Sequence, residues 1–164
     1  MENSFCSFLI VSVFIVFALY VNSIIKNYTC ENNVVDVFYR QFIHNDSYHL
    51  LETIAGLIGI YFVEKEIGSK KFIQLVILLL FLNTCLELIL HKIYPNIQCS
   101  VGFYGIIIGI LIWNIINSHE VNIFLVVVVV SVIVYPFRKK NNNTSLIINI
   151  LSGLAGIISA YIII

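Results

Sequence analysis

The stretch that decides the fold is Ser100–Leu111, which reads S-V-G-F-Y-G-I-I-I-G-I-L. It opens an apolar run that continues to Ile116, and glycines interrupt this run at positions 102, 105 and 109. On a helix, spacings of three and four residues place these glycines on one stripe without side chains. In lipid, such a stripe lets the backbone of another helix come close, so we expect a central transmembrane helix at about 102–117.

The composition indicates a membrane protein. The chain has 164 residues, of which 60 % are hydrophobic and 11 % are charged, and its mean hydropathy is +0.98. Soluble domains carry about 25 % charged residues. A domain of this size has too small a core to bury so many hydrophobic residues. The formal net charge is zero, which argues against nucleic-acid binding. We expect residues 1–164 to form one membrane domain whose main partner is the lipid bilayer, and the oligomeric state stays open.

Six apolar segments can be measured against the roughly 17–25 residues that a spanning helix needs. The valine-rich fifth segment would suit a strand in water, but in lipid the backbone must bond to itself, which favours a helix. The first segment is too long for a signal-peptide core, so we expect an anchor that stays, with cleavage after Ala18 or Ser23 as the alternative. We therefore predict an all-α polytopic bundle with six transmembrane helices at about 5–25, 49–63, 72–90, 102–117, 122–136 and 145–164.

The last predicted helix carries a second face of small residues. This face consists of Ser152, Gly153, Ala155 and Gly156. Small residues on two helices allow close backbone contact in lipid. We expect this helix to be the partner of the stripe formed by Gly102, Gly105 and Gly109.

Taken in order, the landmarks of the chain resemble the rhomboid family of intramembrane serine proteases. Tyr39-Arg40 stands where rhomboids have a Trp-Arg pair, and Phe42-Ile43-His44 followed by His49-Leu50-Leu51 resembles their Phe-x-His…His-Leu-x pattern. Glu64 with Gly68 matches the acidic residue and the glycine after the second helix. Gly102-Phe103-Tyr104-Gly105 stands at the Gly-x-Ser-Gly motif. The resemblance covers the six-helix core and implies a rhomboid-like bundle.

The departures from the family fall on its chemistry. In rhomboids, the serine of Gly-x-Ser-Gly attacks the peptide bond and a histidine on the last helix is its base. Here Tyr104 holds the serine position, and Asn149 or Ile150, depending on the register, holds the base position. His49 matches the oxyanion-stabilising histidine, but Thr53 replaces its asparagine partner. A tyrosine hydroxyl, with a pKa of about 10, is a poor acyl nucleophile without a positioned base.

Three functions fit these residues. We expect a catalytically inactive pseudoprotease that binds transmembrane clients. The first alternative is a divergent active rhomboid protease with a non-standard base, for which Ser100 and Ser152 are the nearest hydroxyls that could replace the nucleophile. The second alternative is a small channel or transporter with Glu87 and Asn83, four residues apart, in a polar path. A simpler interpretation gives Glu87 no functional role and places it near the membrane interface.

Single residues of the first loop leave further alternatives. Arg40 is interpreted as a donor that braces the loop, and less readily as a reader of substrate charge. His44 and His49 form either a relic oxyanion and gating pair or two interfacial histidines. Their five-residue spacing fits one helical face poorly and no third ligand is near, so we expect no metal and no cofactor.

Two signals disagree on the orientation in the membrane. The first, third and fifth loops carry six Lys and Arg residues against three in the second and fourth, which places the N-terminus outside. The glycosylation sequons lie in the first and fifth loops and are usable only on the lumenal side, where the resemblance also places the first loop. We expect both termini to be cytosolic. The sequon asparagines are Asn27, Asn45, Asn142 and Asn143.

The cysteines divide into two groups. Cys6 and Cys85 lie within predicted helices and are expected to be small apolar fillers. Cys30 lies in the first predicted loop and Cys99 in the third. The two loops are on the same side of the membrane because two predicted spanning helices separate them. If that side is lumenal, oxidising conditions permit a disulfide that ties the first loop to the start of the central helix.

Overall fold

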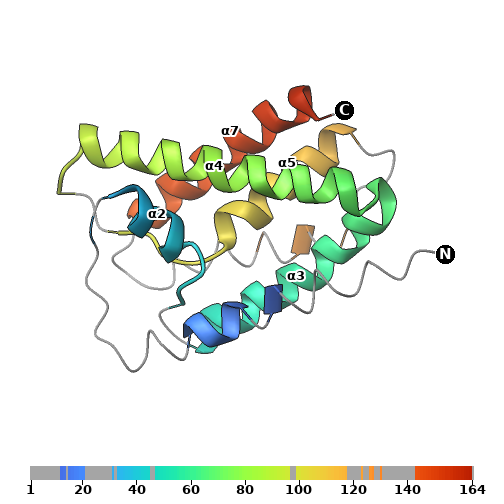
Figure 1. Ribbon diagram of the computed structural model, residues 1–164, viewed down its shortest axis with the longest axis horizontal. Helices are drawn as coiled ribbons and strands as arrows, with labels where there is room; N and C mark the ends of the chain where they lie inside the picture. Colours follow the sequence, from blue (N-terminus) through green and yellow to red (C-terminus); the bar gives the residue numbers. More distant parts are fainter. Residues whose placement is uncertain are drawn as a thin grey trace.

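The part of the chain that the computed structural model describes is helical. It comprises residues 12–13, 15–20, 31, 33–44, 47–96, 99–117, 123, 126–127, 130 and 143–163. Five helices can be bounded there: α2 (Val34–Arg40), α3 (Ser47–Ile67), α4 (Ser69–Ile93), α5 (Tyr104–Asn117) and α7 (Asn143–Ile162). These described ranges contain no strand, which confirms the all-helical class for them (Figure 1).

The membrane-spanning character is clearest in α4. Among the described helices, α4 alone is long and apolar enough to cross a membrane by length and composition. Two shorter apolar helices are Tyr104–Asn117 and Ile150–Ile162. The predicted helices at 5–25 and 122–136 lie mostly outside the described residues, although 12–13, 15–20, 123, 126–127 and 130 are helical. The number of six transmembrane helices therefore stays a prediction.

The helices differ from their predicted ranges mainly at their ends. α3 is longer at both ends than the predicted 49–63, and only Gly68 separates it from α4. Gly68 has a φ of 84°, a backbone conformation that favours glycine and lets the chain reverse between the two helices. α2 was not predicted, because it lies in the polar stretch before α3. Asn33 caps it, since its side chain accepts a hydrogen bond from the amide of Asp36.

The central helix begins later than its sequence predicts. α5 starts at Tyr104, and Gly102 lies in the turn before it with a φ of 106°. The expectation that Gly102 belongs to the helical glycine stripe is therefore wrong. Gly105 and Gly109 remain on the helix.

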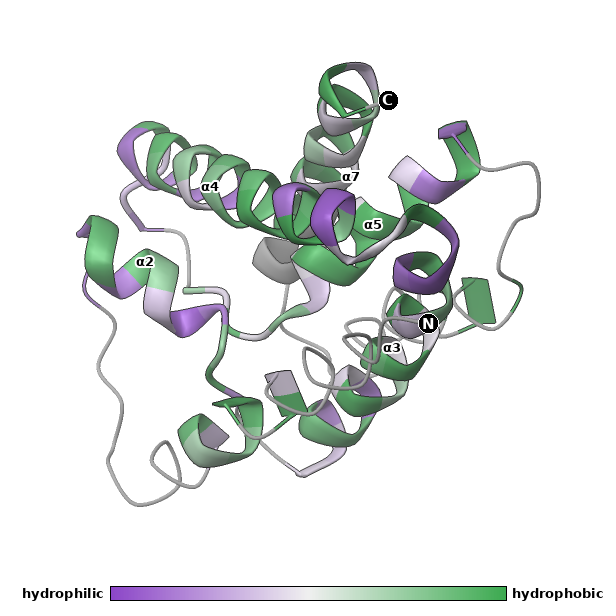
Figure 2. Cartoon of the chain, turned by 45° about the vertical axis from the view of Figure 1, so that its right-hand side comes forward, coloured by the Kyte–Doolittle hydropathy of each residue, from purple (hydrophilic) through white to green (hydrophobic). Residues whose placement is uncertain are grey.

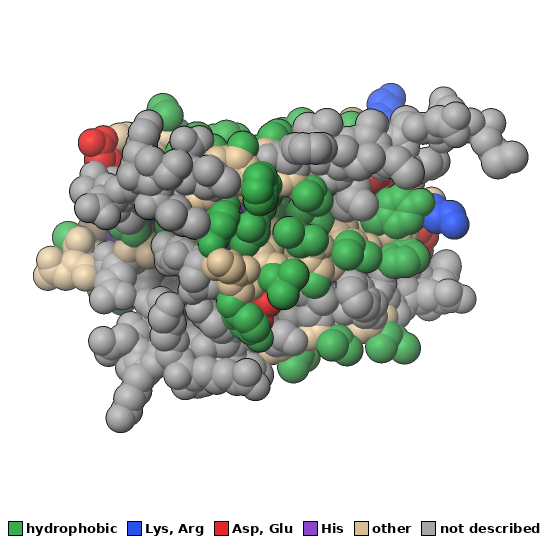
Figure 3. All heavy atoms as spheres, turned by 90° about the horizontal axis from the view of Figure 1, so that it is seen from below, with side chains coloured by type: hydrophobic (Ala, Val, Ile, Leu, Met, Phe, Trp, Pro, Cys, Tyr) green, Lys and Arg blue, Asp and Glu red, His purple; other side chains and the backbone are tan. Residues whose placement is uncertain are grey.

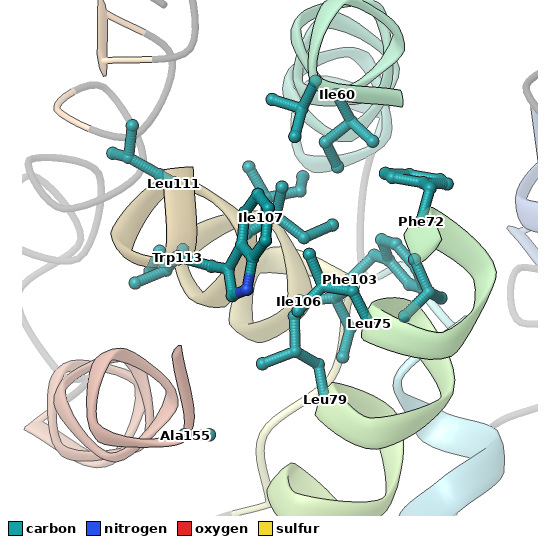
Figure 4. Packing of buried hydrophobic residues seen from close by; sticks show 14 of the residues in the cluster. Ile60, Phe72, Leu75, Leu79, Phe103, Ile106, Ile107, Leu111, Trp113 and Ala155 are labelled. Carbon is teal, nitrogen blue, oxygen red and sulfur yellow. The ribbon is translucent and has the colours of Figure 1, made fainter. Parts of the chain in front are cut away.

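α5 is the centre of the packing. It contacts α3, α4 and α7, so that three helices surround it. Its isoleucines Ile106, Ile107 and Ile110 are fully buried. They meet apolar side chains from the neighbouring helices, among them Leu75 of α4 and Ile60 of α3 (Figure 4).

The contact between α5 and α7 depends on small residues. A Cβ at Gly156 would lie 2.5 Å from the carbonyl oxygen of Gly109, and a Cβ at Gly105 would lie 2.6 Å from Oγ of Ser152. α7 is thus the partner of the α5 glycines. Gly153 lies off this contact, because a Cβ there would meet nothing within 4 Å.

The outer surface carries many large apolar side chains. Figure 2 shows that hydrophobic residues make up much of α3 and α4, and Figure 3 shows hydrophobic side chains gathered across one face of the molecule. Contiguous apolar surface of this kind marks a membrane or protein contact. Exposed examples are Leu51, Ile58 and Phe62 on α3, Ile77, Phe81 and Ile89 on α4, and Ile150, Leu154 and Ile162 on α7.

Candidate functional site

Tyr104 lies at the N-terminal end of α5 and is only 6 % exposed. Its ring lies against the ring of His49 on α3, with 4.4 Å between the ring centroids. Its hydroxyl donates a hydrogen bond to Oε2 of Glu52 and lies 3.4 Å from the carbonyl oxygen of His49. Tyr104 therefore spans the gap between α5 and α3.

Glu52 is a residue of this site that the sequence analysis missed. It is buried on α3, one turn after His49, and its carboxylate accepts the hydrogen bond of the Tyr104 phenol. The sequence could have pointed to Glu52, because an ionisable residue inside a predicted membrane helix is a functional candidate. The same rule had singled out Glu87 on α4.

His49 is held between Tyr104 and the turn before α5. A Cβ at Gly102 would collide with the imidazole, so this ring packs directly on the glycine backbone. The ring of His44 lies 4.9 Å from that of His49 in a T-shaped contact. Nε2 of His44 lies 2.8 Å from Oγ1 of Thr53, whose hydroxyl donates to the carbonyl oxygen of His49. The structure thus brings together His44, His49, Thr53, Gly102 and Tyr104.

The base position differs between its two alternatives. Ile150 is 60 % exposed and does not face the site. Asn149 lies in α7, but its side chain lies outside what the structure describes. Ser152, one turn further, is fully buried and donates to the carbonyl oxygen of Ile148.

A small polar cavity lies beside the N-terminal end of α5. Its volume is about 20 Å³, which is room for about one water molecule. It is far too small for a peptide substrate. The cavity is lined by Ser100 and Ser152, the two serines of the divergent-protease alternative. Asn83 and Glu87 of α4 and Tyr104 of α5 also line it.

Arg40 joins α2 to α4 through a buried charge cluster. Its guanidinium is fully buried and donates to Oε1 of Glu87 at 2.7 Å and to Nε2 of His91 at 3.0 Å. It also donates to Asp36 at 3.1 Å and to the sulfur of Cys99 at 3.3 Å. These contacts fit the bracing interpretation of Arg40. They also show that Glu87 lies in a buried ion pair.

The loop between α2 and α3 is held at further points. Gln41 donates to the hydroxyl of Thr84 at 2.8 Å, and the amide of Gly102 donates to the carbonyl oxygen of Arg40 at 3.0 Å. Tyr39 is 43 % exposed and lies on the outer side of α2. Glu64 is buried near the end of α3, before the Gly68 turn.

The remaining predicted sites are only partly described. Cys99 is a free thiol and Cys30 lies outside the described residues, so their disulfide stays a prediction. Cys85 is a half-buried free thiol on α4. Within the described ranges no group of three His, Cys, Asp or Glu side chains could hold a metal ion. Of the sequon asparagines, Asn143 begins α7, whereas Asn27, Asn45 and Asn142 lie outside the described residues.

Gly102→Ala is expected to destabilise the protein by roughly 2–5 kcal/mol. The alanine would carry the strain of its left-handed backbone, roughly 1–2 kcal/mol, and its Cβ would also displace His49. Gly68→Ala is the matched control, because Gly68 has a φ of 84° but open space around its Cβ position. The free energy of unfolding in detergent measures both variants. Equal losses would show that His49 is not held against Gly102.

Comparison with known proteins gives one distant similarity. The chain is 27 % identical over 86 residues to a protein of Acanthamoeba polyphaga mimivirus described as "Putative rhomboid protein". The match covers 52 % of this chain and 50 % of that protein, so the chain matches about half of its relative's length. No model of a protein family matches the chain, and no solved structure matches it.

The fold and this similarity agree on a coarse description of the protein. The described residues are all-helical, and α4 is apolar and long enough to span a membrane. The distant similarity is to a protein described as a putative rhomboid. The chain is rhomboid-like in this sense.

Proposed function

We propose that this chain is a non-catalytic, rhomboid-like, multi-pass membrane protein that binds transmembrane clients. The observation that carries the proposal is the position of Tyr104. Its ring is buried against His49 and its hydroxyl is bonded to Glu52, at the position where the resemblance puts the nucleophilic serine.

Acyl transfer needs a nucleophile that reaches within about 3–3.5 Å of a carbonyl while a base removes its proton. The phenol of Tyr104 is turned toward α3, and the adjoining cavity has room for about one water molecule. Ile150 cannot accept a proton, and asparagine at position 149 is not a base at neutral pH. A residual oxyanion site at His49 would stabilise an intermediate that no nucleophile forms.

Client binding is proposed from the resemblance to the rhomboid family, whose inactive members bind transmembrane clients, together with the apolar outer surface. Large hydrophobic side chains are exposed on α3, α4 and α7. In a bilayer these side chains meet lipid or the helix of another membrane protein. A client with a single transmembrane helix is the simplest partner for such a surface.

One observation favours a divergent protease as the second candidate. Glu52 accepts the hydrogen bond of the Tyr104 hydroxyl, and a carboxylate in this position is a base that could activate a nucleophile. The burial of both residues argues against substrate access. The divergent protease requires a reactive hydroxyl oxygen, whereas the non-catalytic protein has none.

The channel alternative loses its support. Glu87 is paired with Arg40, and the amide of Asn83 donates to the carbonyl oxygen of Leu79. Between α3 and α5, a Cβ at Gly56 would collide with the side chain of Ile107. The packing between α3 and α5 at this point is therefore close and apolar.

The test uses the full-length chain in proteoliposomes with a model transmembrane substrate and a fluorophosphonate probe. We expect neither cleavage nor probe labelling, while an active rhomboid in the same vesicles shows both. Labelling that disappears in Ser100→Ala, Ser152→Ala or Tyr104→Phe would identify a nucleophile and contradict the proposal. Crosslinking to the same substrate measures client binding, with a polyleucine helix as the control. Equal crosslinking to both helices would contradict the client-binding part.

A further inference from the structure

We propose that Glu52 and Tyr104 form a latch that keeps the degenerate site closed. The cavity beside Ser152 becomes accessible when the hydrogen bond between the carboxylate and the phenol breaks. This inference deepens the proposed function, since it concerns how the same site is regulated and rests on Tyr104 being a non-catalytic residue.

The two partners of the latch belong to different helices. Glu52 lies in the second turn of α3, and Tyr104 is the first residue of α5. The two residues are 52 positions apart in the sequence, so the bond joins segments that only the fold brings together. Breaking it separates the N-terminal end of α5 from α3 at one defined point.

Burial makes this hydrogen bond strong. Glu52 is 9 % exposed and Tyr104 is 6 % exposed. A buried carboxylate without a donor is costly, and a hydrogen bond to a charged group is stronger than one between neutral groups. The phenol supplies that donor to Glu52. The pair therefore stabilises the closed arrangement more than the contact of the ring with His49 would alone.

The surroundings of Tyr104 allow the ring to move once it is released. The residue begins a helix, and the residues from Cys99 to Phe103 before it are not helical. Gly102, with its φ of 106°, lies two residues before the ring. Tyr104 and Ser152 both line the small cavity, so displacement of the ring enlarges the space in front of Ser152.

Thiol accessibility tests the latch with a matched control on the same helix. Ser152 and Ser159 are both fully buried, and each donates to the carbonyl oxygen four residues earlier at 2.8 Å. Of the two, Ser152 lines the cavity. The full chain carrying Ser152→Cys or Ser159→Cys is treated in liposomes with methyl methanethiosulfonate. Mass spectrometry of the peptides follows the labelling rate at each position, so the native cysteines do not interfere.

Tyr104→Phe and Glu52→Leu are the unlatched variants, since each removes one partner of the bond. We expect labelling at position 152 to rise about tenfold to a hundredfold, as the loss of a hydrogen bond to a charged group predicts. Labelling at position 159 stays unchanged. The double variant gives no larger rise than the stronger single variant, because both changes break the same bond.

Two results would overturn the latch. An equal rise at positions 152 and 159 would show general loosening of the fold, and no rise at position 152 would show that the bond does not close the cavity. Failure of the proposed function is a different result. It would be seen as fluorophosphonate labelling of Tyr104 in the otherwise unchanged protein.

Discussion

Glu87→Ala is expected to destabilise the protein by about 3–5 kcal/mol, which makes it one of the most damaging substitutions in the described residues. The carboxylate of Glu87 lies 2.7 Å from the guanidinium of Arg40, and the Arg40 side chain has no exposed surface. Without Glu87, the buried guanidinium keeps Asp36, at 3.1 Å, as a carboxylate partner but loses the closer and more deeply buried one. Reversible unfolding in detergent measures the loss.

The control for this prediction is a substitution of an exposed acidic residue. Glu66→Ala, near the end of α3, should change the free energy of unfolding by less than about 1 kcal/mol. Replacing both charges, with Arg40→Met and Glu87→Leu together, should recover most of the stability lost in Glu87→Ala. A double variant that is less stable than Glu87→Ala would contradict the view that the loss comes from the buried charge of Arg40 being deprived of Glu87.

Gly156→Leu is expected to cost about 3 kcal/mol or more and to separate α7 from α5. A Cβ at this position would lie 2.5 Å from the carbonyl oxygen and 3.0 Å from the Cα of Gly109. These are backbone atoms, which cannot turn aside as a flexible side chain can. The free energy of unfolding gives the size of the effect.

The matched control lies three residues earlier on α7. Gly153→Ala should leave stability unchanged or raise it by up to about 1 kcal/mol, because its Cβ enters open space and alanine favours a helix more than glycine does. The two glycine substitutions therefore differ in sign. Similar destabilisation by both would show that α5 and α7 do not meet at Gly109 and Gly156.

The sequence predicts the helix pairing at the centre of the fold well. Small residues recur at helical spacing on both α5 and α7, and few arrangements other than close helix packing need them there. The helical class also follows from the apolar segments, since lipid leaves the backbone few alternatives. Gly102 was misassigned because a sequence does not distinguish a glycine needed for close packing from one needed for a positive φ.

The candidate site was only partly predictable. Tyr104, His49 and Thr53 were singled out by their place in the resemblance, and the structure brings them together. Arg40 and Glu87 were both noted, but their pairing across 47 residues depends on the fold. Glu52 was missed because its role comes from the side chain that it meets on another helix.

The cluster of Arg40 and Glu87 has a consequence for the biogenesis of the protein. The ribosome makes Arg40 well before Glu87, which it adds 47 residues later within an apolar segment. A carboxylate entering lipid alone is penalised, and a neighbour of opposite charge removes much of this penalty. If the loop that contains α2 is already at the membrane, Arg40 is present there before Glu87 of α4 is made. We therefore expect the insertion of α4 to depend on a segment that is translated earlier, so that the two would assemble in a fixed order.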